Sequence, residues 1–281
     1  MIKVLKAGFY TSIQDKGREG YASIGVPVSG VMDTYSSDLA NRILNNVETD
    51  AVLEIAFGLC AFEFLSETII CISGGHFSPK INGAPISLQT RIRVYKKDVL
   101  TFGHNSFGAR CYLAVKNGFL TAQVLKSKSF FQNITLQSLL SNGDVLPIGV
   151  FAASTDPSNT SVKIVEDHFE SQKIACYKGP EFDALEAFQK EALVKQVFTI
   201  SNDNNRMGYR LNEVIENELP SILTSAVLPG TVQLTPSGEL IVLMRDCQVT
   251  GGYPRVLQLT NTAINQLAQK KTNDTFQFVL K

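Results

Sequence analysis

The sequence has no surplus of charge and no long apolar stretch. Its 281 residues include 26 Lys and Arg and 26 Asp and Glu, so the formal net charge is zero. A neutral chain has no general attraction to nucleic acid or to an anionic membrane surface. No segment reaches the eighteen apolar residues expected of a membrane-spanning helix, and Met1–Lys6 lacks the apolar core of a signal peptide. We therefore expect no nucleic acid, no membrane, and a cytoplasmic location.

Cysteine and histidine are too few and too scattered for common metal or disulfide chemistry. The five cysteines are odd in number, form no Cys-x-x-Cys pair and lie mostly inside apolar runs, where they resemble small hydrophobic residues. The three histidines, His76, His104 and His168, are far apart and lack the spacing of metal ligands. We expect neither structural disulfides nor a metal site.

Three familiar catalytic motifs are also missing. The chain has no Gly-x-x-x-x-Gly-Lys-Ser/Thr phosphate loop, no Gly-x-Gly-x-x-Gly dinucleotide fingerprint and no Gly-x-Ser-x-Gly nucleophile elbow. Any catalysis must therefore rest on clusters of Asp, Arg, Gln and Tyr.

The remaining pattern predicts a mainly β fold with a few short helices. Between 51 and 115, short apolar segments alternate with turn residues and leave no room for crossover helices, which favours an antiparallel barrel or sandwich. We expect two β-rich lobes, 1–165 and 166–281, with 117–156 as a loop-rich surface segment. The last strand has no obvious local partner, so the lobes could exchange strands. The individual elements predicted are strands at 2–10, 51–57, 61–64, 68–73, 91–95, 99–102, 110–115, 161–165, 174–177, 197–201, 222–227, 231–234, 239–244 and 275–280, and helices at 34–46, 181–194 and 261–269. Asp33 or Thr34 would cap the first helix, and Phe188 should face inward from the second.

A polar cluster follows the apolar run 240–243. Polar groups at the end of a rigid strand are well placed to build a site. The glycines allow positive φ or close approach of another group. A glycine-rich turn is the alternative, but a turn does not require the polar neighbours. The candidate residues here are Asp246, Gln248, Thr250, Gly251, Gly252 and Tyr253.

Two further clusters are candidates. Gln14, Asp15 and Arg18 lie in a glycine-containing bend, for which the alternative is a tight turn held by an Asp15–Arg18 pair. Arg206 and Arg210 are four residues apart and should point to one side, where two guanidinium groups would suit a carboxylate or phosphate. Ion pairs with acidic residues of 213–218 are the alternative.

Read together, the clusters resemble a known family. They resemble those of the biotin-dependent carboxyltransferase family, and the resemblance covers nearly the whole chain. Within this family the chain is most similar to the allophanate hydrolase subunit 2 or KipA group, which includes the C-type subunit of bacterial 5-oxoprolinase. It implies cyclophilin-like barrels and a site completed by companion subunits. Two stretches depart from the usual pattern, at 116–118 and at Arg245, Cys247 and Val249. The motifs that carry the resemblance are Gln14–Tyr21, Gly25–Asp33 with Leu39–Asn41, Asn205–Leu211, Gly230–Gln233, and Asp246 with Thr250–Pro254.

The resemblance implies an activity in a complex. The first of three functions that it suggests is ATP-dependent opening of the lactam of 5-oxo-L-proline to L-glutamate. ATP would be supplied through A-type and B-type 5-oxoprolinase subunits. Arg206 and Arg210 would hold a carboxylate or phosphate and Asp246 would orient a proton transfer. The residues expected to bind the small amide substrate are Gln14, Asp15, Arg18, Asp33, Gln248, Thr250, Gly251, Gly252 and Tyr253.

Two other functions stay open. The second is transfer of CO2 from carboxybiotin to urea or a related amide; since the chain has no Met-Lys-Met attachment motif, biotin would arrive on a separate carrier. The third is a non-enzymatic regulator that binds a sensor-kinase inhibitor. The absence of fused carboxylase or carrier sequence favours the first function. We further expect the loops Gln14–Tyr21 and Arg245–Tyr253 to meet, with Arg206 and Arg210, at an electropositive cleft.

Overall fold

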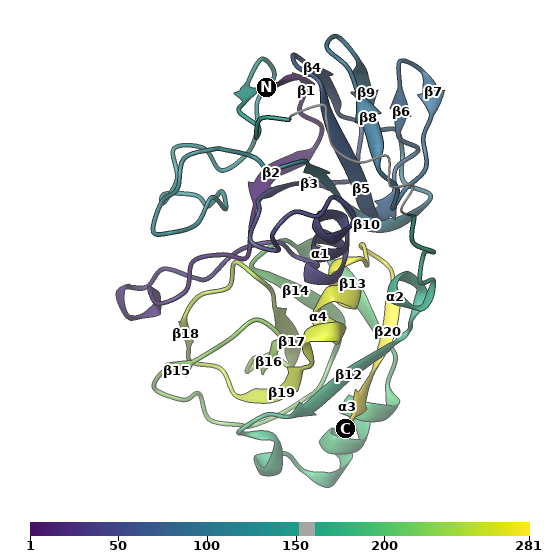
Figure 1. Cartoon of the computed structure of the whole chain (residues 1–281). Coiled ribbons are helices and arrows are strands. Elements are labelled where there is room, and N and C mark those ends of the chain that lie inside the picture. Colours follow the sequence, from purple (N-terminus) through teal and green to yellow (C-terminus); the bar gives the residue numbers. More distant parts are fainter. Residues whose placement is uncertain (152–160) are drawn as a thin grey trace. The chain divides into compact units, whose positions relative to one another are not determined.

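The computed structural model describes residues 1–151 and 161–281, which form two compact units. The first unit contains Met1–Arg18 and Asp33–Glu166, and the second contains Glu19–Met32 and Asp167–Lys281 (Figure 1). The segment Glu19–Met32, which the sequence analysis assigned to the N-terminal lobe, thus belongs to the second unit. Residues 152–156, expected to be surface loop, lie outside the described residues.

The first unit is a sandwich of two sheets. One has the strand order β11-β1-β4-β9-β6-β7 and the other β2-β3-β10-β5-β8, and all pairings are antiparallel. Apolar residues of both sheets, such as Val4, Phe62, Leu53 and Leu113, form one core between them. The strands are β1 (Ile2–Lys6), β2 (Tyr10–Gln14), β3 (Val52–Ala56), β4 (Ala61–Phe64), β5 (Thr68–His76), β6 (Lys80–Ile81), β7 (Ala84–Pro85), β8 (Ile92–Val94), β9 (Val99–Thr101), β10 (Phe107–Val115) and β11 (Val145–Leu146).

The helix of the first unit begins where the sequence predicted. Asp33 is the N-cap of α1 (Thr34–Ile43), and its side chain accepts a hydrogen bond from the backbone N–H of Ser36 at 3.2 Å. This satisfies one of the donors that a helix start leaves unpaired. The helix packs on β5 and β10. The face that these strands turn away from the core is therefore covered.

Two predicted strands of the first unit differ from the structure. The expected strand 2–10 is broken because Gly8 adopts a φ of 77°, so β1 and β2 join different sheets. The expected strand at 161–165 is absent, and Ser161 makes only an isolated bridge to Thr90. The apolar residues of 161–165 suggested a strand, but a strand also needs a neighbouring strand to pair with, which composition does not reveal.

The second unit is built on a closed barrel of seven strands. Its order is β12-β19-β16-β17-β14-β13-β20, with β12 and β20 parallel. The predicted β-rich fold with a barrel is confirmed. The strands of this unit are β12 (Lys173–Lys178), β13 (Phe198–Asn204), β14 (Gly208–Val214), β15 (Ser225–Ala226), β16 (Thr231–Leu234), β17 (Glu239–Leu243), β18 (Thr250–Gly251), β19 (Arg255–Leu259) and β20 (Thr275–Leu280).

The last strand stays within its own unit. β20 pairs with β12 through Lys173–Cys176 and with β13 through Phe198 and Thr199, so it closes the barrel. The suggested exchange of this strand between lobes is wrong. The partner was not visible in the sequence because β12 lies about a hundred residues earlier and pairs in the parallel sense.

Three predictions in the second unit need adjustment. The expected helix 181–194 is divided into a 3₁₀ turn η2 (Phe182–Ala184) and α3 (Ala187–Lys195), because Leu185 is extended and Glu186 with Gln189 forms a capping box. Phe188, expected inside, is 64% exposed. The expected strand 222–227 is reduced to the two residues of β15. The short 3₁₀ turn η1 (Ala22–Ile24) and helices α2 (Asp167–Glu170) and α4 (Asn261–Ala268) complete the unit.

Within 1–151 and 161–281, no helix combines the length and apolarity needed to cross a membrane, and no group of His, Cys, Asp and Glu is arranged to hold a metal ion. All five cysteines are buried, with free thiols.

Candidate functional site

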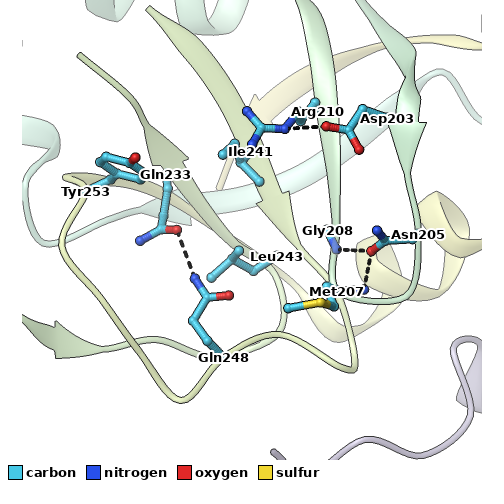
Figure 2. Close-up of a pocket in the computed structure, with 10 residues that line it drawn as sticks. All are labelled: Asp203, Asn205, Met207, Gly208, Arg210, Gln233, Ile241, Leu243, Gln248 and Tyr253. Carbon is cyan, nitrogen blue, oxygen red and sulfur yellow. Dashed lines mark hydrogen bonds and ion pairs between the residues drawn. The ribbon is translucent and has the colours of Figure 1, made fainter. Parts of the chain in front are cut away.

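The second unit contains a cavity of about 280 Å³. In Figure 2, Ile241 and Leu243 of β17 lie between a pair of glutamines, Gln233 and Gln248, and the Arg210–Asp203 pair. The cavity therefore combines an apolar floor with polar groups of several kinds. Its lining residues are Asp203, Asn205, Met207, Gly208, Arg210, Gln233, Ile241, Leu243, Gln248 and Tyr253.

Arg210 supplies the positive charge of the cavity. It lies on β14, and its guanidinium binds Asp203 through Nε at 2.7 Å and Glu239 through Nη1 at 2.8 Å. The side chain is 40% exposed, so water screens both ion pairs. Because Asp203 also lines the cavity, the two lining charges cancel. The lining of this cavity therefore carries no net positive charge, while the electropositive cleft expected between the two loops stays a prediction.

Two primary amides form the opposite wall. Gln233 of β16 is only 1% exposed, and its Oε1 accepts a long hydrogen bond of 3.4 Å from Nε2 of Gln248. The Nε2 atom of Gln233 is buried and has no hydrogen-bond partner. An unpaired buried donor costs free energy, on the order of 1–3 kcal/mol, so this amide is a place where a ligand could add a bond.

Gly251 matters through its lack of a side chain. A Cβ atom at this position would lie 2.5 Å from Nε2 of Gln233, so only glycine lets the strand β18 approach the amide this closely. Neither Gly251 nor Gly252 has a positive φ. Of the two reasons considered for this glycine pair, the structure supports close approach and not an unusual backbone angle. Tyr253, 40% exposed, follows them at the cavity.

A buried ion pair joins the two turns beside the cavity. Arg206 binds the carboxylate of Asp246 with both Nε, at 2.7 Å, and Nη2, at 2.9 Å. The same carboxylate accepts from the hydroxyl of Ser29 at 2.5 Å, and Nη2 of Arg206 also donates to the carbonyl of Gly30 at 2.6 Å. Arg206 and Asp246 are 5% and 7% exposed. This network anchors the segment Glu19–Met32 to the barrel.

The expected pairing of Arg206 with Arg210 is wrong. Arg206 lies in the turn between β13 and β14, where the side chain of Asn205 accepts the N–H groups of Met207 and Gly208. The strand geometry begins only at Gly208, so the even spacing does not bring the two side chains together. Both arginines form intramolecular ion pairs, as the alternative supposed, but their partners are Asp246, Asp203 and Glu239.

The candidates of the first unit form a separate network. Asp15 accepts hydrogen bonds from the hydroxyls of Ser127, at 2.6 Å, and Ser129, at 2.7 Å, and from the backbone N–H of Lys128. Arg18 donates through Nη2 to the carbonyl of Ser129. Ser127 and Ser129 are fully buried, so the run expected to be surface loop holds this bend in place. The sequence analysis considered a local Asp15–Arg18 pair as the cause of this turn. In the structure, hydrogen bonds to the distant segment Ser127–Ser129 hold the turn in place.

Gln14 and Asp33 are also buried in the first unit. Gln14 donates to the hydroxyl of Ser12 at 3.0 Å, and Asp33 caps α1 while its backbone N–H donates to the hydroxyl of Tyr112 at 2.8 Å. Gln248 and Tyr253 are thus the predicted substrate-binding residues that the structure brings together with Arg210 at one cavity. Whether the two loops meet as predicted stays a prediction, since Gln14–Arg18 of the first loop belongs to the first unit and Arg245–Tyr253 to the second.

Sequence reasoning did not select Gln233 or Ser29, although both lie within motifs that it noted. A glutamine between apolar residues in Thr231–Leu234 is a usable signal, because a buried amide requires partners. Asp203 was also missed, since surface acidic residues are common and carry little information by themselves.

The sequence and the fold match a known class of protein. The sequence model described as "Carboxyltransferase domain, subdomain A and B" matches residues 24–280, so the chain belongs to this family, and the family resemblance is confirmed. The chain is 30% identical to the C-type 5-oxoprolinase subunit of Escherichia coli strain K12, over 99% of this chain and 91% of that protein. It is 30% identical to "Urea amidolyase" of Lachancea kluyveri, over 99% of this chain but 17% of that protein.

Solved structures agree with this assignment. The chain superposes on the urea amidolyase of K. lactis with a TM-score of 0.87 and 27% identity, covering 99% of this chain and 18% of the solved chain. It superposes on the urea carboxylase of Kluyveromyces lactis with a TM-score of 0.85 and 26% identity, covering 99% and 27%. The chain therefore corresponds to one portion of these larger enzymes.

Proposed function

We propose that this chain is a subunit of an ATP-dependent 5-oxoprolinase that opens 5-oxo-L-proline to L-glutamate. The observation that carries the proposal is the match to C-type 5-oxoprolinase subunits over nine-tenths or more of their length, 91% in Escherichia coli and 90% in Haemophilus influenzae. The cavity supports it, because an apolar floor with amide and guanidinium groups suits a small ring that bears a lactam and a carboxylate.

The residues divide the work as follows. Arg210 binds the substrate carboxylate, since its guanidinium has further N–H groups beyond those used by Asp203 and Glu239. Asp246 is held by Arg206 and Ser29 and does not line the cavity, so it keeps the turn that carries Gln248 in place. ATP binds through companion subunits of the A and B types, since this chain carries no nucleotide motif.

The test is reconstitution. The isolated chain should show neither ATP hydrolysis nor 5-oxoproline hydrolysis, while the chain copurified with its companion subunits should form L-glutamate and ADP only when 5-oxoproline is present. Robust turnover by the isolated chain would contradict a shared site. A complete complex that ignores 5-oxoproline would contradict the substrate.

The urea-carboxylating alternative rests on the family match and on the urea amidolyase relatives. It predicts that the complex is inert with 5-oxoproline but transfers CO2 from a carboxylated biotin carrier to urea. Radiolabelled bicarbonate, a biotin carboxylase and its carrier measure this directly, so the two functions give opposite results in paired assays.

A further inference from the structure

The side-chain amide of Gln233 has a buried N–H donor that no neighbouring group pairs with. Its side chain is 1% exposed and its Nε2 is both buried and without a hydrogen-bond partner. Buried polar groups are nearly always satisfied in folded proteins. A donor that the fold leaves unpaired in the wall of a cavity therefore points to a ligand that pairs with it.

One end of this amide is paired and the other is not. Nε2 of Gln248 donates to Oε1 of Gln233 (Figure 2), so the carbonyl end is occupied. The NH2 end lies beside Gly251, where an added Cβ atom would be 2.5 Å from Nε2. Turning both amides by half a rotation would exchange the roles of the two ends and would still leave one polar atom unpaired beside Gly251. The unpaired position is thus a property of the site, and its character as a donor belongs to the orientation in which Gln248 donates to Gln233.

Two more exposed side chains line the cavity together with this amide. Gln248 is exposed and Tyr253 is 40% exposed, and both line the cavity with Gln233. Gln233 itself is held by β16, which pairs with β17 and β19 in the barrel wall. A rigid donor behind movable surface side chains is suited to select among small ligands.

We propose that Gln233 is the specificity-determining residue of this cavity and donates a hydrogen bond to the carbonyl oxygen of an amide ligand. Gln248 is a positioning residue that holds the Gln233 amide in this orientation. The inference rests on the proposed function for the identity of the amide. The shared chemistry is a carbonyl oxygen beside an N–H group, which both the lactam of 5-oxo-L-proline and urea provide.

Nuclear magnetic resonance of the 281-residue chain, labelled with ¹⁵N in its glutamine side chains, tests the contact directly. The Gln233 NH2 signals, assigned by their loss in Gln233→Glu, should shift with 5-oxo-L-proline or with urea. Cyclopentanecarboxylate, which keeps the ring and the carboxylate but has no amide, should leave them unchanged. The inference is overturned if neither amide shifts these signals, or if cyclopentanecarboxylate shifts them equally.

Matched variants test the energetics. Gln233→Glu keeps the shape but replaces the donor by an acceptor, so the Kd of the responding amide should rise about tenfold or more, the equivalent of one lost hydrogen bond to a buried group. Gln172→Glu, the same change at an exposed glutamine of the same unit that does not line the cavity, should leave Kd unchanged. An equal Kd for Gln233→Glu and wild type would refute the role of Gln233.

Gly251→Ala provides a second variant that leaves the glutamine intact. Its added methyl group would meet the movable end of Gln233 and no backbone atom closer than 3.4 Å, so the fold should persist while the amide is displaced. Binding of the amide should weaken, with the melting temperature near that of wild type. Unchanged binding with a displaced Gln233 signal would count against the proposal, and this test remains usable if Gln233→Glu does not fold.

The reconstituted complex separates this inference from the proposed function. If the complex hydrolyses 5-oxoproline and Gln233→Glu raises KM, both stand. If it hydrolyses 5-oxoproline with an unchanged KM in Gln233→Glu, the function stands and the inference fails. If the complex is inert with 5-oxoproline but urea still shifts the Gln233 signals, the function fails and the inference stands.

Discussion

At the scale of single residues, the buried pair of Arg206 and Asp246 shows how a predicted site residue can have a structural duty. Both oxygens of Asp246 are engaged by Arg206, and one also accepts from Ser29. A buried carboxylate paired in this way stabilises the fold only while its partner is present, since removal of one member leaves a desolvated charge. The pair therefore couples Glu19–Met32 to the barrel turns.

Replacing Asp246 by Ala should lower the free energy of unfolding by about 3–5 kcal/mol, because Arg206 would stay buried without its counter-charge. Ser29→Ala removes one hydrogen bond and should cost only about 1–2 kcal/mol. Urea unfolding followed by circular dichroism measures both. A smaller loss for Asp246→Ala than for Ser29→Ala would show that the ion pair does not hold this region.

A catalytic duty for Asp246 is tested separately. If it orients a proton transfer, Asp246→Asn should reduce turnover of the reconstituted complex about 100-fold, with a changed pH–rate profile. If it only positions Arg206, then Arg206→Lys should reproduce the loss with the wild-type pH profile. Steady-state kinetics of the two variants over a range of pH distinguish these outcomes.

At the scale of elements, β20 determines whether the barrel closes. Its inward residues Phe276 and Phe278 are 1% exposed, and the ring of Phe278 lies 5.3 Å from that of Phe198 and 5.1 Å from that of Phe276. Val279, the next residue along the strand, is 38% exposed. Alternation along a half-buried strand explains the difference.

Phe278→Ala should therefore cost about 3–5 kcal/mol of stability, because it removes a large buried ring from a packed cluster. Val279→Ala is the matched control in the same strand and should cost less than about 1 kcal/mol. Thermal unfolding of the two variants provides the comparison, and similar losses would mean that β20 does not contribute to the core as described.

At the scale of the whole molecule, buried thiols link stability to pH. Burial raises the pKa of Cys60, Cys71 and Cys247 to about 12 and that of Cys176 to about 11, from an ordinary value of 9.0. Cys60 and Cys71 are buried in the first unit, and Cys176 and Cys247 are buried in the second. Their protonated form is the one that the folded chain accommodates.

The sign of the pH dependence follows from these values. The folded pKa values lie above those of the unfolded chain, so the contribution to stability is complete below pH 9 and is lost as pH rises from about 9 towards 12. We expect the urea midpoint to fall over this range, and a Cys247→Ala variant to lose less than wild type. A midpoint independent of pH above 9 would contradict this linkage. Reaction of the thiols with a disulfide reagent at pH 8 should likewise require prior unfolding.

Local patterns were sufficient for much of the fold. The helix start at Asp33, the strand Thr275–Leu280 and the antiparallel sandwich were predicted because capping residues, β-branched and aromatic runs and turn residues act on neighbours in the chain. The family was likewise recognisable from motifs spread over the sequence. What the sequence by itself determined is therefore the class of elements, the family and the general position of the polar clusters.

Only the tertiary structure decided which polar groups share a site. Arg206 and Arg210 are close in sequence but face different partners, because a turn ends between them. Gln233 and Gly251 are distant in sequence but touch, because β16 and β18 approach closely enough to exclude a side chain. The partner of β20 was likewise hidden until the barrel closed. Such contacts depend on burial and on pairing between distant segments, which no local window of sequence contains.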